Sequence, residues 1–255
     1  MDPYVGITDF MSGDQVRDML AVFERSLPEA SRRILHVGVM MSRKTLHDIP
    51  TRWAAAFPPK ERIASIFCSD RTLNCIHYAD SEKSDDLTRS LVRAIGYGGI
   101  GMHALQLDLV WPEPSEIANA VHLSRANIEV ILQIGANALA AVRDDPRRLV
   151  GKLAEYRGII HRVLLDKSMG RGIGMDAPKL IPFARAIREH FPELGIGAAG
   201  GLGPNTMHLA APLIAEFPDI SIDAQGRLRP SGSALDPVDW TMAAEYLRQA
   251  LTLLS

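Results

Sequence analysis

The sequence predicts an α/β protein whose strands and helices alternate as a closed (β/α)8, or TIM, barrel. Two observations favour this fold class. Short apolar or β-branched runs alternate with helical patterns along all 255 residues, which is typical of a parallel sheet with crossover helices. Eight units of each kind can be counted, the number that closes a barrel. An open doubly wound sheet is the alternative, but no Gly-x-Gly-x-x-Gly motif follows the first expected strand, as its dinucleotide-binding form requires.

The strands are expected where short apolar runs end in charges or turn residues. They span Tyr4–Thr8, Ile34–Met40, Arg62–Phe67, Met102–Leu107, Ile128–Gln133, His161–Asp166, Leu194–Ala199 and Ile220–Asp223. The expected helices span residues 13–26, 48–56, 84–96, 114–124, 146–156, 177–190, 205–215 and 236–253. The region 68–83 is the least regular, and its piece Asn74–Tyr78 is compatible with an extra strand or a loop.

Capping signals support three of the expected helices. Ser12 precedes apolar residues at helical spacing and Gln15 follows three residues later, the pattern of a capping box. Pro204 and Pro237 fall at expected first turns, where the missing N–H of proline costs nothing. No low-complexity linker or change in composition divides the chain, so residues 1–255 are expected to form a single domain.

Composition and charge exclude several classes of protein. With 47% hydrophobic and 23% charged residues, the chain is expected to be globular. Its formal net charge of −2 predicts no long-range attraction to nucleic acid or to an anionic membrane. No apolar run can span a bilayer and no secretory signal is recognised, so a cytoplasmic location is expected. Cys68 and Cys75 predict reduced thiols. A monomer and a homodimer are both compatible with the sequence.

The clearest sign of function lies after the expected sixth strand. The apolar run Val163–Leu165 ends in Asp166 and opens into a glycine-rich loop with Gly172 and Gly174. Parallel α/β proteins build their sites at the carboxyl ends of strands. We therefore expect Asp166 to act as a catalytic acid, because partly dry surroundings raise the pKa of a carboxyl group and suit it to proton donation. The alternative to a catalytic role is a structural one, in which Asp166 caps a helix or forms an ion pair.

Lys167 follows directly and offers a different chemistry. A desolvated lysine at this position can form a Schiff base with a carbonyl substrate, as in an aldolase. Neighbouring residues of a strand face opposite ways, so Asp166 and Lys167 cannot both point along the barrel axis. The aldolase is therefore the less favoured alternative.

A second glycine-rich turn follows the expected seventh strand. Gly200 and Gly201 precede Pro204, which opens a helix, and backbone N–H groups at a helix start bind anions. Gly226 follows the last expected strand, and phosphate sites after the seventh and eighth strands are frequent in barrels. Together with the two glycines after Asp166, these residues predict a phosphate site and a small phosphorylated substrate.

Other polar residues stand at expected strand ends. Arg43 follows the second strand, where a guanidinium group can bind a substrate carboxylate or stay hydrated. Gln106, near the end of the fourth strand, can hydrogen-bond a ligand or link core residues. Asp9 and Asp108 are further carboxylates at the ends of the first and fourth strands.

The histidines are candidate metal ligands, and the two arginines after the last strand are candidates for binding phosphate. The eight histidines show no spacing such as His-x-x-x-His, so no metal is expected. His36, His103 and His161 stand at expected strand beginnings and are interpreted as structural. Arg227 and Arg229 follow the last strand and either pair with phosphate or are solvated.

Several motifs can be compared with a known family. Residues 5–8 (VGIT) are similar to the family's first strand, Cys-Gly-Ile-Thr. Residues 37–40, with Arg43 beyond them, are similar to its second strand and the basic residue that follows. Residues 104–108 (ALQLD) are similar to its strand Val-Gln-Leu-His. Residues 164–166 (LLD) with 172–174 (GIG) are similar to Leu-Leu-Asp and Gly-Thr-Gly, and 199–205 (AGGLGPN) to Ala-Gly-Gly-Leu-Asn-Pro-Glu-Asn. Over most of its length the chain thus resembles the phosphoribosylanthranilate isomerase family of tryptophan biosynthesis.

The resemblance implies a (β/α)8 barrel that performs an Amadori rearrangement of a phosphorylated aldosylamine without a cofactor. Asp166 matches the family's general acid. Val5 stands where the family has the cysteine that acts as general base, and Asp9 or Asp108 are the nearby carboxylates that could replace it. The alternative is a protein on the same scaffold that binds a phosphorylated sugar without catalysis.

Overall fold

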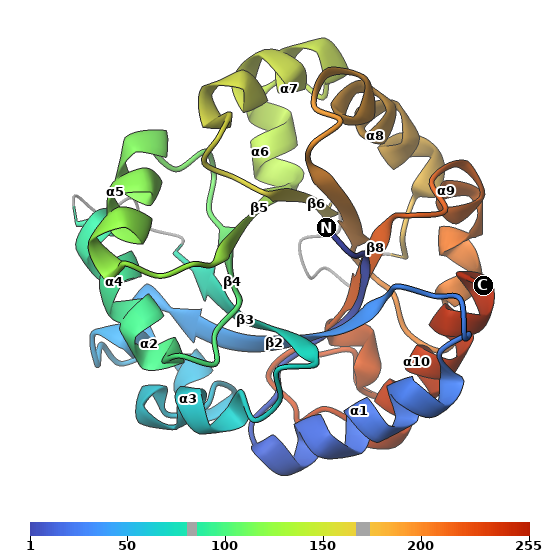
Figure 1. Ribbon diagram of the computed structural model, residues 1–255, viewed down its shortest axis with the longest axis horizontal. Helices are drawn as coiled ribbons and strands as arrows, with labels where there is room; N and C mark the ends of the chain where they lie inside the picture. Colours follow the sequence, from blue (N-terminus) through green and yellow to red (C-terminus); the bar gives the residue numbers. More distant parts are fainter. Residues whose placement is uncertain (81–85, 167–173) are drawn as a thin grey trace.

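The computed structural model describes residues 1–80, 86–166 and 174–255. Within these ranges eight parallel strands are paired in chain order, and the last pairs with the first, so the sheet closes into a barrel. Figure 1 shows the strands at the centre of the molecule, with the helices forming an outer ring around them. The predicted fold class is confirmed.

The strands are short and largely buried, as expected for a sheet that is covered by helices outside and filled by side chains inside. They are β1 (Tyr4–Thr8), β2 (Ile34–Ser42), β3 (Thr72–Ala79), β4 (Ala104–Asp108), β5 (Glu129–Gly135), β6 (Arg162–Asp166), β7 (Gly195–Ala199) and β8 (Ser221–Ala224). All except β3 overlap the runs predicted from the sequence.

The helices follow the strands on the outside of the barrel. The α-helices are α1 (Gly13–Ser26), α2 (Arg43–Leu46), α3 (Ile63–Ile66), α4 (Leu87–Gly98), α5 (Pro114–Ser124), α6 (Ala136–Ala141), α7 (Pro146–Leu153), α8 (Ala177–His190), α9 (Ala211–Glu216) and α10 (Trp240–Leu253). The short 3₁₀ turns are η1 (Arg52–Ala55), η2 (Lys60–Arg62), η3 (Ala154–Tyr156), η4 (Met207–Ala210) and η5 (Gly226–Leu228). The predicted capping box is confirmed, since Ser12 Oγ accepts from the N–H of Gln15 and Gln15 Oε1 accepts from the N–H of Ser12.

The predicted third strand at Arg62–Phe67 is wrong. Ile63 and Ile66 are both buried and stand three residues apart, the spacing of one helical face, and they form α3. The third strand is β3, within the irregular region 68–83, where the piece Asn74–Tyr78 is compatible with a strand or a loop. Its first seven residues are buried without a gap, as in a strand covered on both faces. The helix expected at 48–56 is reduced to η1.

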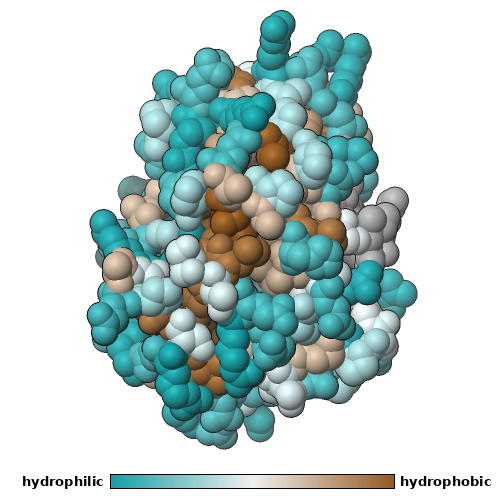
Figure 2. Space-filling view, turned by 90° about the vertical axis from the view of Figure 1, so that its right-hand side faces the viewer, coloured by the Kyte–Doolittle hydropathy of each residue, from teal (hydrophilic) through white to brown (hydrophobic). Residues whose placement is uncertain are grey.

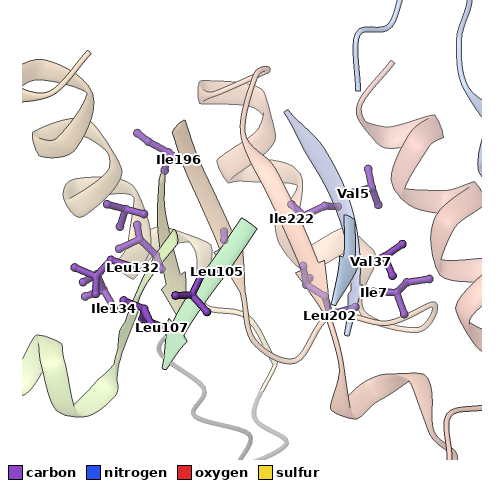
Figure 3. Packing of buried hydrophobic residues seen from close by; sticks show 14 of the residues in the cluster. Val5, Ile7, Val37, Leu105, Leu107, Leu132, Ile134, Ile196, Leu202 and Ile222 are labelled. Atoms are coloured by element: carbon purple, nitrogen blue, oxygen red, sulfur yellow. The ribbon is translucent and has the colours of Figure 1, made fainter. Parts of the chain in front are cut away.

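The strands of the barrel have two faces with different neighbours. Val5, Ile7 and Val37 belong to the large cluster between the barrel wall and the helices, and Figure 3 shows them on that side of the wall. Tyr4 and Leu164 belong to a second, smaller cluster inside the barrel. The alternation of β1 therefore directs residues 4, 6 and 8 inward and residues 5 and 7 toward the helices.

A buried ion pair lies at the amino-terminal end of the barrel. The Nε of Arg162 lies 2.5 Å from Oε2 of Glu129, and the guanidinium group lies over the ring of Tyr4, 5.5 Å from its centroid. Arg162 is 3% exposed and lines a small cavity of about 130 Å³ at this end.

The outer surface of the molecule is mixed. Figure 2 shows the side that carries α9 and the C-terminus in Figure 1, with apolar residues gathered near its centre and hydrophilic residues around them. Among the described residues no helix is both long enough and apolar enough to cross a bilayer.

Candidate functional site

A cavity of about 830 Å³ opens at the carboxyl ends of the strands, the end at which barrel enzymes carry their sites. Its floor is made by inward-facing residues from the ends of seven strands. These are Met40, His77, Asp108, Gln133, Asp166, Ala199 and Asp223. The floor therefore holds three carboxyl groups, an imidazole and an amide, all from regular strands whose positions the barrel determines.

Asp166 lies where the sequence predicted an acid. It is the last residue of β6 and is 9% exposed. Gln133 Nε2 donates to its Oδ2 at 3.2 Å, so one oxygen is oriented by the neighbouring strand. Asp108 ends β4 and also lines the cavity, and burial raises the pKa of its carboxyl group.

Asp223 is a third carboxyl group in the cavity and was not singled out in the sequence. It is 4% exposed, and Thr8 Oγ1 donates to its Oδ2 at 3.0 Å. Burial raises the pKa of Asp223 to about 7, and the charge of Asp166 adds to the rise, while the bond from Thr8 opposes it. A group with this pKa can accept or donate a proton near neutral pH. Asp223 stands at the carboxyl end of an apolar strand, the same signal that predicts a site residue at Asp166.

The space around Asp223 depends on a glycine. A β-carbon at Gly6 would lie 2.4 Å from Asp223 Oδ1 and 2.9 Å from Nδ1 of His36. Any other residue at position 6 would therefore displace the carboxyl group. His36 is fully buried beside it, with its Nδ1 3.8 Å from Asp223 Oδ1. Burial lowers the pKa of His36 to about 3, so this ring is neutral.

Asp223→Asn is expected to stabilise the protein relative to wild type, and increasingly so as the pH rises from 4 to 7. The pKa of Asp223 is raised from 3.8 to about 7, so in this window the folded protein holds a proton that the unfolded chain releases. The stability of the wild type then falls as the pH rises, by at most about 1.4 kcal/mol per pH unit for one group. Asparagine does not ionise. Urea-unfolding free energies of both proteins across this range test the effect, and a pH-independent difference would contradict it.

A chain of polar contacts runs across four neighbouring strands of the floor. Gln106 Nε2 donates to Gln133 Oε1 at 2.9 Å and lies 3.2 Å from Nδ1 of His77. Gln133 continues the chain to Asp166. Gln106 itself is fully buried and does not line the cavity, so of its two predicted roles it fills that of a link between core residues.

Gly200 and Gly201 form part of the cavity rim, as Gly226 does. Their φ angles are 104° and 66°, in the region that favours glycine, so this turn exposes its backbone without side chains. Arg227 follows Gly226 and also lines the cavity, which places a cation beside these turns. The helix start expected at Pro204 is wrong, because the next helical elements are η4 (Met207–Ala210) and α9 (Ala211–Glu216), so among the described residues no helix N-terminus adjoins this turn.

The other predicted glycines are placed differently. Gly174 is not among the residues that line the cavity, and a β-carbon there would lie 2.7 Å from Cδ1 of Leu209. Gly172 and Lys167 lie outside the described residues, so the predictions of a phosphate contact and of a Schiff base at these positions stay predictions.

Another part of the cavity wall comes from the segment after β2. Arg43 and Lys44, at the start of α2, line it together with Trp53. Arg43 lies 3.7 Å from Asp86, and its side chain is 24% exposed. The ring of Trp53 stacks on Phe57 with centroids 5.7 Å apart. Sequence reasoning chose Arg43 but missed Trp53, because the helix expected at 48–56 gave no reason to place it at the mouth.

Asp9 is engaged elsewhere. Its carboxylate is paired with Arg229, which is 3% exposed, and it accepts from Gln225 Nε2 at 3.1 Å. Asp9 has a φ of 91° and is not among the residues that line the cavity. The geometry of Asp9 favours a structural ion pair over proton transfer. Of Arg227 and Arg229, the two arginines that follow the last strand, only Arg227 lines the cavity.

Val5 faces away from the site. It lies in the helix-facing cluster, so a thiol at this position would also point away from the cavity. The interior positions of β1 next to the floor are Gly6 and Thr8, and Thr8 contacts Asp223. The inward face of β1 therefore contributes Gly6 and Thr8 to the site, and residue 5 does not contribute to it.

In the described part of the chain no three residues of the histidine, cysteine and acidic types are grouped so that they could hold a metal ion. His161 is at the amino-terminal side of the barrel, where its Nδ1 accepts from the N–H of Val130 at 3.0 Å, in keeping with a structural role.

The comparisons with known proteins identify the fold. No protein-family model and no curated protein matches the chain. A Chromobacterium violaceum protein assigned to spore coat polysaccharide biosynthesis is 10% identical over 99% of this chain and 75% of its own, with a TM-score of 0.59. A Rubisco-like protein from Rhodopseudomonas palustris is 14% identical over 98% of this chain and 63% of its own (TM-score 0.54). The carboxyl transferase domain of Rhizobium etli pyruvate carboxylase is 14% identical over 100% of this chain and 48% of its own, with a TM-score of 0.55.

Proposed function

We propose that this protein is a cofactor-independent isomerase that converts a phosphorylated aldosylamine into a ketosylamine, the reaction implied by its resemblance to phosphoribosylanthranilate isomerases. One observation carries the proposal: Asp166 and Asp223 line the same cavity as the glycine turn Gly200–Gly201. Two acid–base groups and an anion site on one rim are the minimum that this chemistry needs.

The reaction requires one proton donor and one proton acceptor. Asp166 is proposed to protonate the ring oxygen of the sugar, which breaks the bond between that oxygen and C1 and leaves a C1=N iminium ion. Asp223 is proposed to take the proton from C2, and the electron pair of that bond moves toward nitrogen to give an enolamine. The enolamine then gains a proton at C1 and loses one from its C2 hydroxyl group, which yields the ketone.

The pKa of about 7 supports Asp223 as the base. Part of the rise comes from the charge of Asp166, so Asp223 ionises more readily when Asp166 is protonated, as the mechanism requires. Burial still makes Asp223 a stronger base than an exposed carboxylate. Asp108 is the remaining candidate on the floor. Its raised pKa makes it a second possible proton carrier, placed on β4.

The anion site would hold the phosphate group. Backbone N–H groups near Gly201 and Gly226, with the Arg227 guanidinium group beside them, are proposed to bind the phosphate, while Arg43, at the part of the wall after β2, binds a second polar or anionic part of the substrate. Binding at both ends would position C1 and C2 over the floor.

The direct test is turnover by the wild-type protein. Phosphoribosylanthranilate and a set of phosphorylated aldosylamines with other amines are incubated with the protein, and ketosylamine formation is followed by liquid chromatography and mass spectrometry. We expect product from at least one of them. Tight binding by calorimetry without product from any would reject the isomerase and support the phosphosugar-binding alternative. Neither binding nor product would reject both.

A further inference from the structure

His77 is a buried residue of the cavity floor for which the reaction steps described above have no use. It lies near the carboxyl end of β3, is 5% exposed and lines the cavity. Its partner in the neighbouring strand β2 is Met40, whose thioether has no N–H or O–H to donate. Its partner in β4 is Gln106. Of these two neighbours only Gln106 can donate a hydrogen bond to the ring.

Gln106 lies over the face of the imidazole ring. Its Nε2 is 3.2 Å from Nδ1 and 3.5 Å from Nε2 of His77. A donor placed in the plane of the ring, on the lone pair of one nitrogen, would be much farther from the other nitrogen. The amide group of Gln106 therefore faces the π-electrons of the ring, and neither nitrogen receives an in-plane hydrogen bond from it.

The rest of the described chain leaves both nitrogens available to a ligand. Within residues 1–80, 86–166 and 174–255 no further hydrogen bond to the ring of His77 is formed. Buried polar groups without a partner are costly and rare in native proteins. Because the ring borders the cavity, we expect a group of the ligand to complete it.

The ring can both donate and accept a hydrogen bond. Burial lowers the pKa of His77 to about 4, opposed by the charges of Asp9 and Asp166, so the imidazole is neutral at pH 7. A neutral imidazole has one N–H group and one bare nitrogen. The effect of Asp166 on this pKa also means that the two side chains lie within electrostatic reach of each other.

We propose that His77 is a catalytic residue that contacts the C2 hydroxyl group of the substrate and takes its proton when the enolamine becomes the ketone. The catalytic part of this assignment rests on the proposed isomerase function, in which that step has no assigned base. The contact with the hydroxyl group requires only that a phosphorylated sugar binds in the cavity.

The step balances with the groups already on the floor. Asp223, which carries the proton taken from C2, returns it to C1, and the electron pair of the C1=C2 bond forms the new C1–H bond. The electron pair of the O–H bond then forms the C2=O bond, and the hydroxyl proton passes to the bare nitrogen of His77. The imidazolium ion gives up a proton to Asp166, which donated its own to the ring oxygen at the start.

A weakly basic imidazole suits this role. The hydroxyl group becomes strongly acidic while C1 gains its proton, because a protonated ketone releases its proton readily. His77 can therefore accept the proton at this point and release it afterwards, which restores the neutral ring for the next turnover.

The contact is tested by calorimetry with ribose 5-phosphate and 2-deoxyribose 5-phosphate, which differ only in the C2 hydroxyl group. The wild type is expected to bind ribose 5-phosphate about tenfold more tightly, the contribution of one hydrogen bond. In His77→Phe the preference is expected to disappear. Phenylalanine keeps an aromatic face for Gln106 but has no nitrogen. His77→Leu takes its place if that protein does not fold.

Turnover and a control variant complete the test. With an aldosylamine phosphate that the wild type converts, His77→Phe is expected to lower kcat by about 10²-fold or more. Cys75→Ala changes an inward residue of the same strand that belongs to the cluster inside the barrel and does not line the cavity. It should keep both the binding preference and kcat.

The outcomes separate the two proposals. Equal binding of the two sugar phosphates by the wild type, or binding of neither, would overturn the contact, and so would a preference that persists in His77→Phe. An unchanged kcat in His77→Phe would reject His77 as the base and leave the isomerase standing. A preference that is lost in His77→Phe, without ketosylamine product from the wild type, would reject the isomerase and leave the contact standing.

Discussion

Asp166→Asn is expected to lower kcat for the aldosylamine substrate by about 10²–10⁴-fold, the range that one general acid contributes. Asparagine has nearly the same shape, and its side-chain oxygen can still accept the bond from Gln133 that orients Asp166 in the wild type. It has no acidic proton to give to the ring oxygen. The loss should therefore appear in kcat, while KM, which reflects substrate binding through the phosphate group, changes little.

The matched control is the same substitution on the outside of the barrel. Asp219 pairs with Arg188 at 2.8 Å, and both side chains are well exposed. Asp219→Asn should leave kcat and KM at their wild-type values. Circular dichroism and thermal unfolding of both variants confirm that each is folded before its kinetics are compared. If Asp166→Asn retained half of the wild-type kcat, the assignment of Asp166 as the acid would be wrong.

Arg229→Met is expected to lower the free energy of unfolding by about 3–5 kcal/mol, the cost of leaving one charge of a buried pair without its partner. Asp9 is 4% exposed and would keep only its bonds from Gln225. Arg229 also donates through Nη1 to the carbonyl of Gln225 at 2.8 Å, a contact that the substitution removes as well. For a chain of this size the change corresponds to a fall in Tm of roughly 10 °C.

Two comparisons isolate the buried pair in urea-unfolding experiments. Arg188→Met breaks an exposed pair with Asp219 and should cost no more than about 1 kcal/mol. Asp9→Asn removes the charge that Arg229→Met leaves behind, so the double variant should be more stable than Arg229→Met alone. Equal losses from Arg229→Met and Arg188→Met would show that the pair between Asp9 and Arg229 is not a main support of the fold.

Much of the site was predictable because all strands of a parallel barrel end at one rim. Asp166 and Gly200–Gly201 follow different strands, yet both line the same cavity. The local signals of Ser12 and Gln15 for α1 were equally readable. Such features depend on residues that are close together in the chain. The alternation of strands and helices then brings the ends of all strands to the same side of the barrel.

Other parts of the site depended on which face of each strand turns inward. Both faces of a barrel strand are buried, so Val5 and Gly6 carry no pattern that distinguishes the helix-facing side from the interior. The inward direction of Gly6 and Asp223 was decided only when β1 paired with β8. The same closure placed residue 5, where the resembling family has its cysteine, on the helix-facing side of the barrel wall.

The amino-acid pattern alone indicated seven of the eight strands and the acid at the end of β6. Only the tertiary structure decided that β3 is Thr72–Ala79, that Asp9 pairs with Arg229 across 220 positions of the chain, and that four strands align their polar groups from His77 to Asp166. The physical reason is range. Helix periodicity and caps act over a few residues, whereas the register of a closed sheet and the burial of a charge depend on neighbours that folding alone brings together.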